Sequence, residues 1–352
     1  MPYAPLAEQR LEAARQKASV RILAIETSCD ETAAAIVENG RRILSNAVFS
    51  QIDLHVLYGG VVPEIASRAH VEACAPVVDE ALKAASLTLD EVDAIAVTYG
   101  PGLVGALLTG VAYAKALAFA KGLPLIGVNH IEGHVSANFL THPALEPPFL
   151  CLIVSGGHSH IVQVSDYGVY KVIGRTCDDA AGEAFDKAAR VLGLPYPGGP
   201  MIDSCAENGD PSALWLPKPK TENPYDFSFS GLKTAFINAV RKNERSEAPL
   251  CREDLAASFR EAVVCALVDK TLLAAREMGA PALALAGGVA CNKRLRQLMQ
   301  SRCDALGLRL YMPLPELCTD NAAMIGSAAY FRMRRGEAAG LELNAVPYLP
   351  LA

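Results

Sequence analysis

Two histidines four residues apart carry the clearest chemistry in this sequence. His130 and His134 lie in the segment HIEGH, which follows the apolar run LIGV. Residues four apart share one face of an α-helix, so both imidazoles can reach a single cation at about 2.0–2.1 Å. Two partly exposed histidines that bind no ligand are the alternative interpretation of the same spacing.

The glutamate within this segment argues against a zinc protease. In the H-E-x-x-H motif of those enzymes, the glutamate directly follows the first histidine and aims at the metal-bound water. Glu132 instead lies two residues after His130, which is about 200° around a helix. We therefore expect its carboxylate to point away from a metal held by the two histidines.

A metal site needs at least one further ligand, and Asp320 in PELCTDNAAMIG is our candidate. Two histidines and one carboxylate with open positions suit iron(II) or zinc. The competing interpretation is local, because Thr319 or Asp320 would serve as the N-cap of the last predicted helix.

Glycine pairs occur at three turns, and two of these turns leave apolar runs. Such pairs let a backbone approach a phosphate or carboxylate closely and leave amides free to donate, although ordinary turn formation is the alternative. Taken together they resemble the phosphate and ribose loops of nucleotide-binding proteins. The three segments are LIVSGGHSH at Ser155, Gly156 and Gly157, YPGGPMID at Gly198 and Gly199, and LALAGGVACN at Gly287 and Gly288, followed by Asn292.

One glycine motif is expected to be misleading. The segment GPGLVG at 100–105 matches the dinucleotide fingerprint between a strand and a helix, but the acidic ribose ligand expected after the next strand is missing. A tight strand-to-helix turn is the preferred interpretation. The P-loop motif G-x-x-x-x-G-K-[ST] is absent from the sequence, which argues against a P-loop ATPase.

Composition predicts a two-lobed α/β protein of the cytoplasm. The 352 residues are 51% hydrophobic with 6% aromatics, enough for more than one compact domain. Ten cysteines are scattered without a C-x-x-C spacing, which favours reduced thiols, and the sequence predicts no membrane span. The net charge of −6 means that binding to nucleic acid would depend on local basic patches or on partners.

The order of predicted elements indicates a duplicated βββαβα unit. Three strands and a helix open each half of the chain, followed by a further strand and helix. We predict an exposed helical N-terminal extension at 1–20, a first lobe at 21–141 plus 321–345, and a second lobe at 142–320. The predicted strands are 20–27, 33–37, 42–49, 94–98, 124–128, 150–154, 159–164, 170–175 and 282–285; the predicted helices are 63–85, 102–121, 255–278 and 319–335, with others opening near 181 and after 292.

Nine ordered segments resemble the bacterial threonylcarbamoyl-adenosine transferase family, the Kae/Gcp/YgjD group. The similarity begins near Arg21 and extends to the C-terminal helix, and only the first twenty residues depart from the family pattern. The resemblance implies the two-lobed actin-like, sugar-kinase and Hsp70-like ATPase (ASKHA) fold. The segments are IETSCDET, YGGVVPEIASRAH, GPGLVGALLTG, HIEGH, LIVSGGHS, DDAAGEAFDKAARVLGLPYPGGP, FSFSGLKTA, LAGGVACN and CTDNAAMIG.

The resemblance also implies an activity, a metal and partners. The activity is transfer of the threonylcarbamoyl group from L-threonylcarbamoyl-AMP to N6 of adenosine 37 in tRNAs that read codons beginning with A. Iron(II) would be held at His130, His134 and Asp320. The implied partners are an inactive paralogue and a small P-loop ATPase. The donor would contact Ile153, Val154, Ser155, Gly156, Gly157, Asp186, Gly199, Asp203 and Asn292.

Two questions stay open from the sequence. Asp30 and Glu31 are both candidates for the base that acts on N6, whereas Ser28 and Cys29 are assigned packing roles. The rival functions are an ATP-hydrolysing kinase or chaperone of the same fold and a non-catalytic scaffold. A histidine pair argues against the first rival, because magnesium in such ATPases prefers oxygen ligands.

Overall fold

The computed structural model describes residues 3–351 and divides the chain into two compact units. The first unit extends to Glu146 and also includes Asp166–Val169 and the chain from Thr319 onward. The second unit comprises Pro147–Ser165 and Tyr170–Cys318. Each unit is built on one five-stranded sheet. The predicted lobes, 21–141 plus 321–345 and 142–320, remain a proposal about the domain boundaries.

The first unit has a mixed sheet with the strand order β3-β2-β1-β4-β5. Its first three strands form an antiparallel meander, and β4 and β5 then join β1 in parallel, as βαβ connections require. The elements are α1 (Tyr3–Gln16), β1 (Arg21–Glu26), β2 (Glu31–Glu38), β3 (Arg42–Ser50), α2 (Ile52–Val56), α3 (Pro63–Ala84), β4 (Ala94–Gly100), α4 (Val104–Lys121), β5 (Leu125–Asn129), α5 (His130–Thr141) and α12 (Ala322–Arg334).

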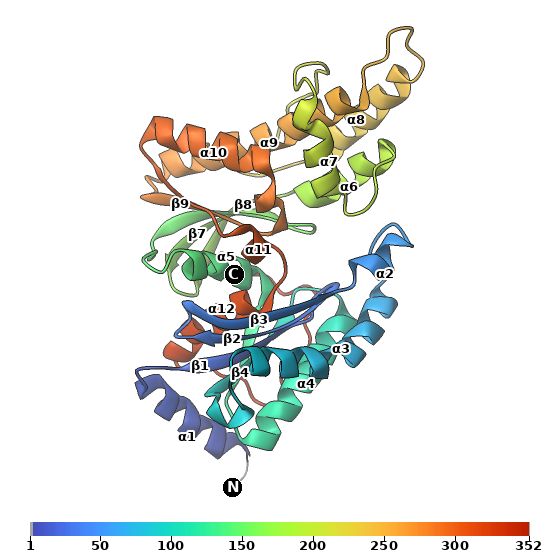
Figure 1. Cartoon of the computed structure of the whole chain (residues 1–352). Helices are drawn as coiled ribbons and strands as arrows, with labels where there is room; N and C mark the ends of the chain where they lie inside the picture. The colour runs from blue at the N-terminus through green and yellow to red at the C-terminus, as the bar shows by residue number, and fades with distance from the viewer. Residues whose placement is uncertain (1–2, 352) are drawn as a thin grey trace. The chain divides into compact units, whose positions relative to one another are not determined.

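Helices cover both faces of this sheet (Figure 1). Leu23 and Ile25 of β1 belong to the core that the sheet shares with α3 and α4. The alternate residue Ala24 faces α12, where a Cβ at Gly326 would come within 2.7 Å of a Val37 methyl group. Gly326 therefore lets α12 lie close to the sheet. Helix α5, which carries the two histidines, packs against α12, and Asp320 directly precedes α12.

The N-terminal helix α1 is docked rather than exposed, which corrects the sequence prediction. The Tyr3 hydroxyl donates a hydrogen bond to the Leu123 carbonyl at 3.0 Å. Leu11 and Ala14 are buried. The helical conformation itself is confirmed over Tyr3–Gln16.

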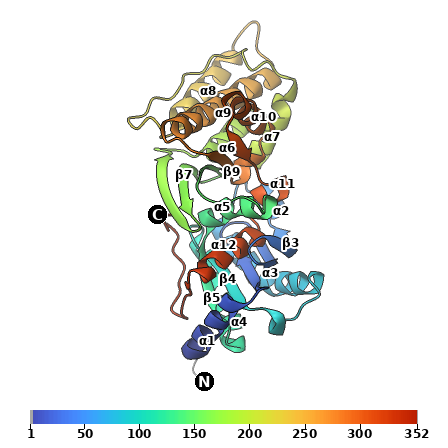
Figure 2. The ribbon, with the colours of Figure 1, turned by 90° about the vertical axis from the view of Figure 1, so that its left-hand side faces the viewer.

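The second unit has the strand order β10-β9-β6-β7-β8, and helices α6 to α10 lie along one face of its sheet (Figures 1 and 2). Residues of β6 and β9 share one hydrophobic core with these helices. The elements are β6 (Phe149–Val154), β7 (Ser159–Asp166), β8 (Val169–Arg175), α6 (Ala181–Val191), α7 (Gly198–Cys205), α8 (Ser230–Asn243), α9 (Arg252–Glu277), β9 (Ala282–Ala286), α10 (Lys293–Leu306), β10 (Arg309–Tyr311) and α11 (Pro315–Cys318).

The predicted duplication is confirmed by the two strand orders. β6, β7, β8, β9 and β10 occupy the places of β1, β2, β3, β4 and β5. The pairing sense also matches, since β6 is antiparallel to β7 and parallel to β9. The polar turns that follow β1 and β6 are therefore equivalent positions in the two units.

Within residues 3–351, one helix is long and apolar enough to cross a membrane by length and composition, and this helix is α4. Its buried positions include Ala106, Leu107 and Val111, and the helix packs against α3 and β4. Its contacts are those of a core helix in a folded domain.

Candidate active site

The two histidines lie at the start of α5, directly after β5. The Asn129 side-chain oxygen accepts a hydrogen bond from the Ile131 amide at 2.8 Å and so caps the helix. The rings of His130 and His134 then lie one turn apart, with centroids separated by 4.6 Å. Both side chains are buried. The predicted shared helical face is present.

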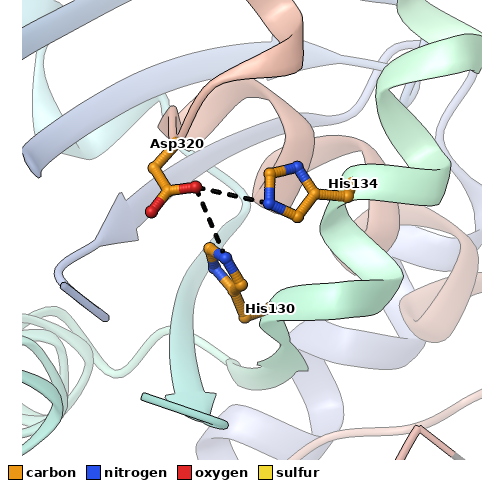
Figure 3. Close-up of side chains that lie close together, drawn as sticks. All are labelled: His130, His134 and Asp320. Atoms are coloured by element: carbon orange, nitrogen blue, oxygen red, sulfur yellow. Dashed lines mark ion pairs between the residues drawn. The ribbon is translucent and has the colours of Figure 1, made fainter. Parts of the chain in front are cut away.

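Asp320 lies against both rings (Figure 3). Its Oδ1 is 3.4 Å from Nε2 of His130 and 3.3 Å from Nε2 of His134. One ligand atom from each of the three residues lies within 4.8 Å of the others. The separations of 3.4 and 3.3 Å between the carboxylate oxygen and the two imidazole nitrogens agree with a cation at ligand distances of about 2.0–2.2 Å.

The helix-capping alternative for Thr319 and Asp320 is wrong. Helix α12 begins at Ala322, and Asn321 caps it by accepting a hydrogen bond from the Met324 amide at 3.0 Å. The Asp320 carboxylate is therefore not needed by the helix and points to the histidines.

The three groups strongly influence each other's protonation. Burial acts to raise the pKa of Asp320, but His130 and His134 stabilise its carboxylate and hold the pKa well below its usual range. Burial acts to lower the pKa of His130, yet the carboxylates of Asp320 and Glu26 outweigh it and raise the pKa. The carboxylates of Asp320 and Glu26 thus lie on two sides of the His130 imidazole and stabilise positive charge there.

His134 provides the test of whether a metal fits. Burial lowers the pKa of its imidazole. Both ring nitrogens are buried; within residues 3–351, Nδ1 has no hydrogen-bond partner, and Nε2 has only the Asp320 carboxylate at 3.3 Å. An unsatisfied buried polar group costs free energy, and a bound cation would remove that cost. Two imidazoles and one carboxylate suit iron(II) or zinc.

Glu26, at the end of β1, orients His130 and was missed by sequence reasoning. Its Oε2 lies 3.1 Å from Nδ1 of His130 and accepts a hydrogen bond from the Thr98 hydroxyl at 2.5 Å. A carboxylate behind a ligating imidazole fixes the ring and leaves the other nitrogen for the metal. The available signal was an acidic residue closing the apolar strand RILAIE.

Ser28 belongs to the same network, which corrects the packing role assigned from the sequence. Its hydroxyl lies 3.1 Å from Nδ1 of His130, and its amide donates to Oε1 of Glu26 at 2.5 Å. The neighbouring Cys29 differs, because burial and the adjacent carboxylates raise the pKa of its thiol well above the usual value. Cys29 is therefore a protonated thiol at neutral pH.

The candidate bases Asp30 and Glu31 form a hydrogen-bonded carboxyl pair at the start of β2. Burial, followed by the negative charges of Asp320 and Asp30, raises the pKa of Glu31 to about 9. Glu31 thus carries a proton at neutral pH. Asp30 is buried beside it and stays the candidate base.

Glu132 lies away from the metal centre, as predicted. Its buried carboxylate pairs with the Arg332 guanidinium of α12 at 2.7 Å. A carboxylate held in this pair is not available to activate a metal-bound water. The position of Glu132 therefore excludes the protease arrangement.

In the second unit, the turn after β6 presents two free amides. The Ser155 amide donates to the His158 carbonyl, and the carbonyls of Ser155 and Gly156 accept from Gly182 and Glu183 of α6. Gly156 and Gly157 are exposed, and their amides donate to no atom of residues 3–351. Two adjacent unpaired amides in a turn form a suitable site for an anionic oxygen.

Ile153 and Val154, also predicted to contact the donor, are fully buried in β6. Val154 belongs to the core of its unit, and its carbonyl lies 2.3 Å from the position of a Cβ added at Gly287. Gly287 has φ +87°, so both its conformation and this close approach require glycine. The backbone at Val154 therefore lies directly against the third glycine turn.

The Asp186 carboxylate contacts the second glycine pair, Gly198 and Gly199. The Asp186 carboxylate accepts a hydrogen bond from the Gly198 amide at 2.7 Å and another from the Gly199 amide. Gly198 and Gly199 open helix α7, so they do not form the loop predicted from the sequence. Burial raises the pKa of Asp186, although the two amides oppose it.

Asp203 and Asn292 both lie at the start of helix α10. Asp203 binds the Arg260 guanidinium at 2.9 Å and accepts from the Lys293 amide at 2.9 Å. Asn292 caps α10 by accepting from the Leu295 amide at 2.9 Å, which commits its side-chain oxygen. Only its side-chain NH₂ group is left to donate to a ligand.

The GPGLVG segment is a packing turn, as expected. A Cβ at Gly102 would lie 2.5 Å from the Ser28 carbonyl, and one at Gly105 would lie 2.7 Å from the Ser67 hydroxyl. The space beside these glycines is thus filled by the protein itself.

Solved structures share the fold at low sequence identity. The chain is similar to HypF from T. kodakarensis (TM-score 0.61, 14% identity, covering 91% of this chain and 49% of that one). It is also similar to (R)-2-hydroxyglutaryl-CoA dehydratase component A from Acidaminococcus fermentans (TM-score 0.53, 14% identity, covering 90% and 99%). These likenesses and the two duplicated units confirm the expected ASKHA fold class.

Sequence relatives are much closer. The family model for tRNA N6-adenosine threonylcarbamoyltransferase matches residues 42–327. A protein of that name from Clostridium botulinum is 55% identical over 336 residues, covering 95% of this chain and 99% of the relative. One from Clostridium perfringens is 56% identical over 331 residues, covering 94% and 98%. The chain therefore belongs to the tRNA N6-adenosine threonylcarbamoyltransferase family of acyltransferase enzymes.

Proposed function

We propose that this chain transfers the threonylcarbamoyl group of L-threonylcarbamoyl-AMP to N6 of adenosine 37 in tRNAs that read codons beginning with A. The names of the Clostridium relatives support transfer of this group to a tRNA adenosine. The observation that carries the proposal is the cluster of the buried His130 and His134 with the half-buried Asp320, in a chain of this family.

The metal in this proposal is iron(II), with zinc as the alternative, held by His130, His134 and Asp320. When bound, it would supply Lewis-acid polarisation of an oxygen ligand. Glu26 keeps Nδ1 of His130 occupied, so that Nε2 stays available. This ligand set disfavours the rival function of an ATP-hydrolysing kinase or chaperone, because magnesium prefers oxygen ligands.

The donor in this proposal binds the second unit through backbone groups. The free amides of Gly156 and Gly157 donate to its phosphate or to the carbonyl oxygen that gains negative charge. Asp186 fixes the start of α7 by accepting hydrogen bonds from Gly198 and Gly199. The space beside Gly199 is open and can hold a ligand. Asn292 adds a side-chain NH₂ donor.

The acceptor chemistry requires little beyond positioning and a base. Adenine N6 is a weak nucleophile because its lone pair is delocalised, whereas the donor is a mixed anhydride and needs no covalent enzyme intermediate. Asp30 is the candidate that removes the N6 proton. Glu31, protonated through its raised pKa, would hold Asp30 by their shared hydrogen bond.

The proposed partners are an inactive paralogue and a small P-loop ATPase, in the cytoplasm and without a membrane. Exposed apolar side chains on the packed helices α3 and α4 support a protein partner: Val71, Val104 and Leu108. Ser67 of α3 meets Gly105 of α4, so these side chains lie near one another. Apolar side chains gathered on one surface often mark a protein interface.

The direct test combines the purified chain, synthetic L-threonylcarbamoyl-AMP, iron(II) and an unmodified tRNA, with the expected partners present or omitted. Nucleoside mass spectrometry should detect threonylcarbamoyladenosine in the digested tRNA. A tRNA with another base at position 37 is the matched control and should stay unmodified. ATP hydrolysis by the chain without any modified nucleoside would favour the rival function.

A further inference from the structure

The short turn between β1 and β2 is held by three hydrogen bonds from outside the turn. It carries Ser28, whose hydroxyl lies 3.1 Å from Nδ1 of His130, and the candidate base Asp30. The carbonyls of three consecutive turn residues accept these bonds: Ser28 from the Leu103 amide at 2.8 Å, Cys29 from the His70 ring at 2.9 Å, and Asp30 from the Gln51 amide at 2.9 Å. The backbone beside His130 is thus fixed by other parts of the first unit.

Two of these donors are backbone amides, whereas the third is a side chain. Leu103 and Gln51 directly precede α4 and α2. His70 lies within α3, and its imidazole is fully buried. A substitution can therefore remove the hydrogen bond to Cys29 and leave the other two in place.

The ring of His70 has one arrangement of its proton that satisfies its partners. The Cys29 carbonyl can only accept, so Nε2 carries the proton and donates it. Nδ1 then accepts a hydrogen bond from the Thr32 hydroxyl at 2.7 Å, and the Gln51 side-chain NH₂ group lies 3.4 Å from the same nitrogen. Burial lowers the pKa of His70, which favours this neutral ring. Both ring nitrogens are thus occupied, and the ring is held between β2 and the turn.

Packing alone does not require an imidazole at this position. An apolar side chain would fill buried space in α3 without the desolvation cost of two ring nitrogens. His70 instead directs its N–H group to the carbonyl of the residue between Ser28 and Asp30. Loss of this bond would free the peptide after Cys29 to rotate, and the side chain of Asp30 would move with it.

We propose that His70 is a positioning residue for the transfer reaction, because it holds the Cys29 carbonyl and thereby the side chains of Ser28 and Asp30. This inference rests on the proposed function, in which Asp30 removes the N6 proton. In this role, His70 contacts neither the donor nor the metal. Its loss should therefore lower the rate of transfer and leave donor binding and metal content unchanged.

Two substitutions separate the hydrogen bond from the rest of the side chain. His70→Gln places an amide NH₂ group near the position of Nε2 and can still donate to Cys29, whereas the shorter His70→Asn reaches only the position of Nδ1. In the complete assay with tRNA, His70→Asn should lower kcat about tenfold or more with little change in KM for the donor, and His70→Gln should keep kcat within about threefold. Cys74→Ala, which removes a buried thiol one turn further along α3, is the matched control and should keep kcat.

Hydrogen exchange gives a readout that does not depend on activity. The amides of residues 28–31 should exchange faster in His70→Asn than in the unaltered chain, and His70→Gln should restore slow exchange. Thermal melting checks that each variant is folded. If His70→Asn does not fold, Thr32→Val takes its place, since it removes the hydroxyl that holds Nδ1 and should also speed exchange in the turn.

The outcomes distinguish this inference from the proposed function. Equal loss of kcat in the Asn and Gln variants, or unchanged exchange of residues 28–31 in His70→Asn, would overturn the positioning role. An unaltered chain that forms no threonylcarbamoyladenosine with its partners would count against the proposed function. In that case, hydrogen exchange would still decide whether His70 holds the turn.

Discussion

At the residue scale, the chemistry depends on which nitrogen of each ring faces Asp320. Both Nε2 atoms do, while Nδ1 of His130 faces Glu26. Nδ1 of His134 is buried without a hydrogen bond. The two histidines are thus unequal: one is oriented by a carboxylate, and the other is positioned by helix α5 alone.

Replacing a ligand should remove the metal. Asp320→Ala and His134→Ala should each lose stoichiometric iron(II) or zinc and most of the transfer activity, because two ligands hold a cation far more weakly than three. Metal analysis of the purified variants is the measurement. Asp304→Ala, on the exposed surface of α10, is the matched control and should keep its metal. Unchanged metal content in both ligand variants would place the ion elsewhere.

Replacing Glu26 should weaken the metal without removing a ligand. Glu26→Gln keeps the volume of this fully buried side chain but removes the charge that orients His130, so metal affinity should fall about 10–100-fold. Competition with a chelator measures the change. Glu38→Gln alters another strand carboxylate that pairs with Arg42 on the surface, and it should leave affinity unaltered. Equal affinities for the two variants would mean that Glu26 serves the fold alone.

At the scale of elements, Gly156 in the turn after β6 and Gly182 in helix α6 lie close together but have different roles. A Cβ at Gly156 would meet no atom within 4 Å, and its φ lies outside the left-handed region. A Cβ at Gly182 would come within 2.6 Å of the Ser155 carbonyl. One glycine therefore leaves space for a ligand, and the other allows the helix to approach the turn.

These two positions give opposite predictions for the same substitution. Gly156→Val should fold normally yet lose binding of AMP at least tenfold, because its side chain fills the open space beside the free amides. Gly182→Val should unfold more easily, by roughly 1–3 kcal/mol, since it overpacks a tight contact. Calorimetry with AMP and urea denaturation measure the two effects. Normal AMP binding by Gly156→Val would remove this turn from the donor site.

Sequence patterns predicted the strands well and the connections less well. Runs of β-forming residues predicted all three strands of each meander, and helices were predicted at α3, α4, α9 and α12. Helix α8 was not predicted, since it follows a proline-rich loop, and the Gly198–Gly199 pair gave no sign that it opens α7. Spacing predicted the histidine pair, and Asp320 was added as a candidate carboxylate, but the role of Glu26 depends on a contact between β1 and α5, which are far apart in sequence.

At the scale of the whole molecule, most of the basic residues in three sequence clusters form ion pairs within the chain. The clusters are Lys218 and Lys220; Lys293, Arg294 and Arg296; and Arg332, Arg334 and Arg335. Arg332 pairs with Glu132, Lys293 with Glu207, and Arg294 with Glu261. Lys218 pairs with Asp269, whereas the exposed Lys220 forms no ion pair with any of the residues 3–351. A phosphate must compete with these carboxylates for the cations, and the net charge of −6 adds an overall repulsion.

The isolated chain should therefore bind tRNA weakly and with strong dependence on salt. Each phosphate that displaces counterions contributes about 0.7–0.9 log units of affinity per log unit of salt, so a few contacts give a steep slope. Fluorescence anisotropy with labelled tRNA between low and physiological salt measures it.

The proposed partner proteins should raise the affinity by adding cations and a longer contact surface. The most informative variant is Glu207→Gln, because it frees Lys293 from its ion pair and leaves the metal centre unchanged. If Lys293 contacts RNA, this variant of the isolated chain should bind tRNA more strongly. Glu91→Gln, which removes an exposed carboxylate near β4, controls for the change in net charge. Tight tRNA binding with an affinity that does not depend on salt would contradict this prediction. It would show that the contacts are not made to phosphates and that the net negative charge does not weaken RNA binding.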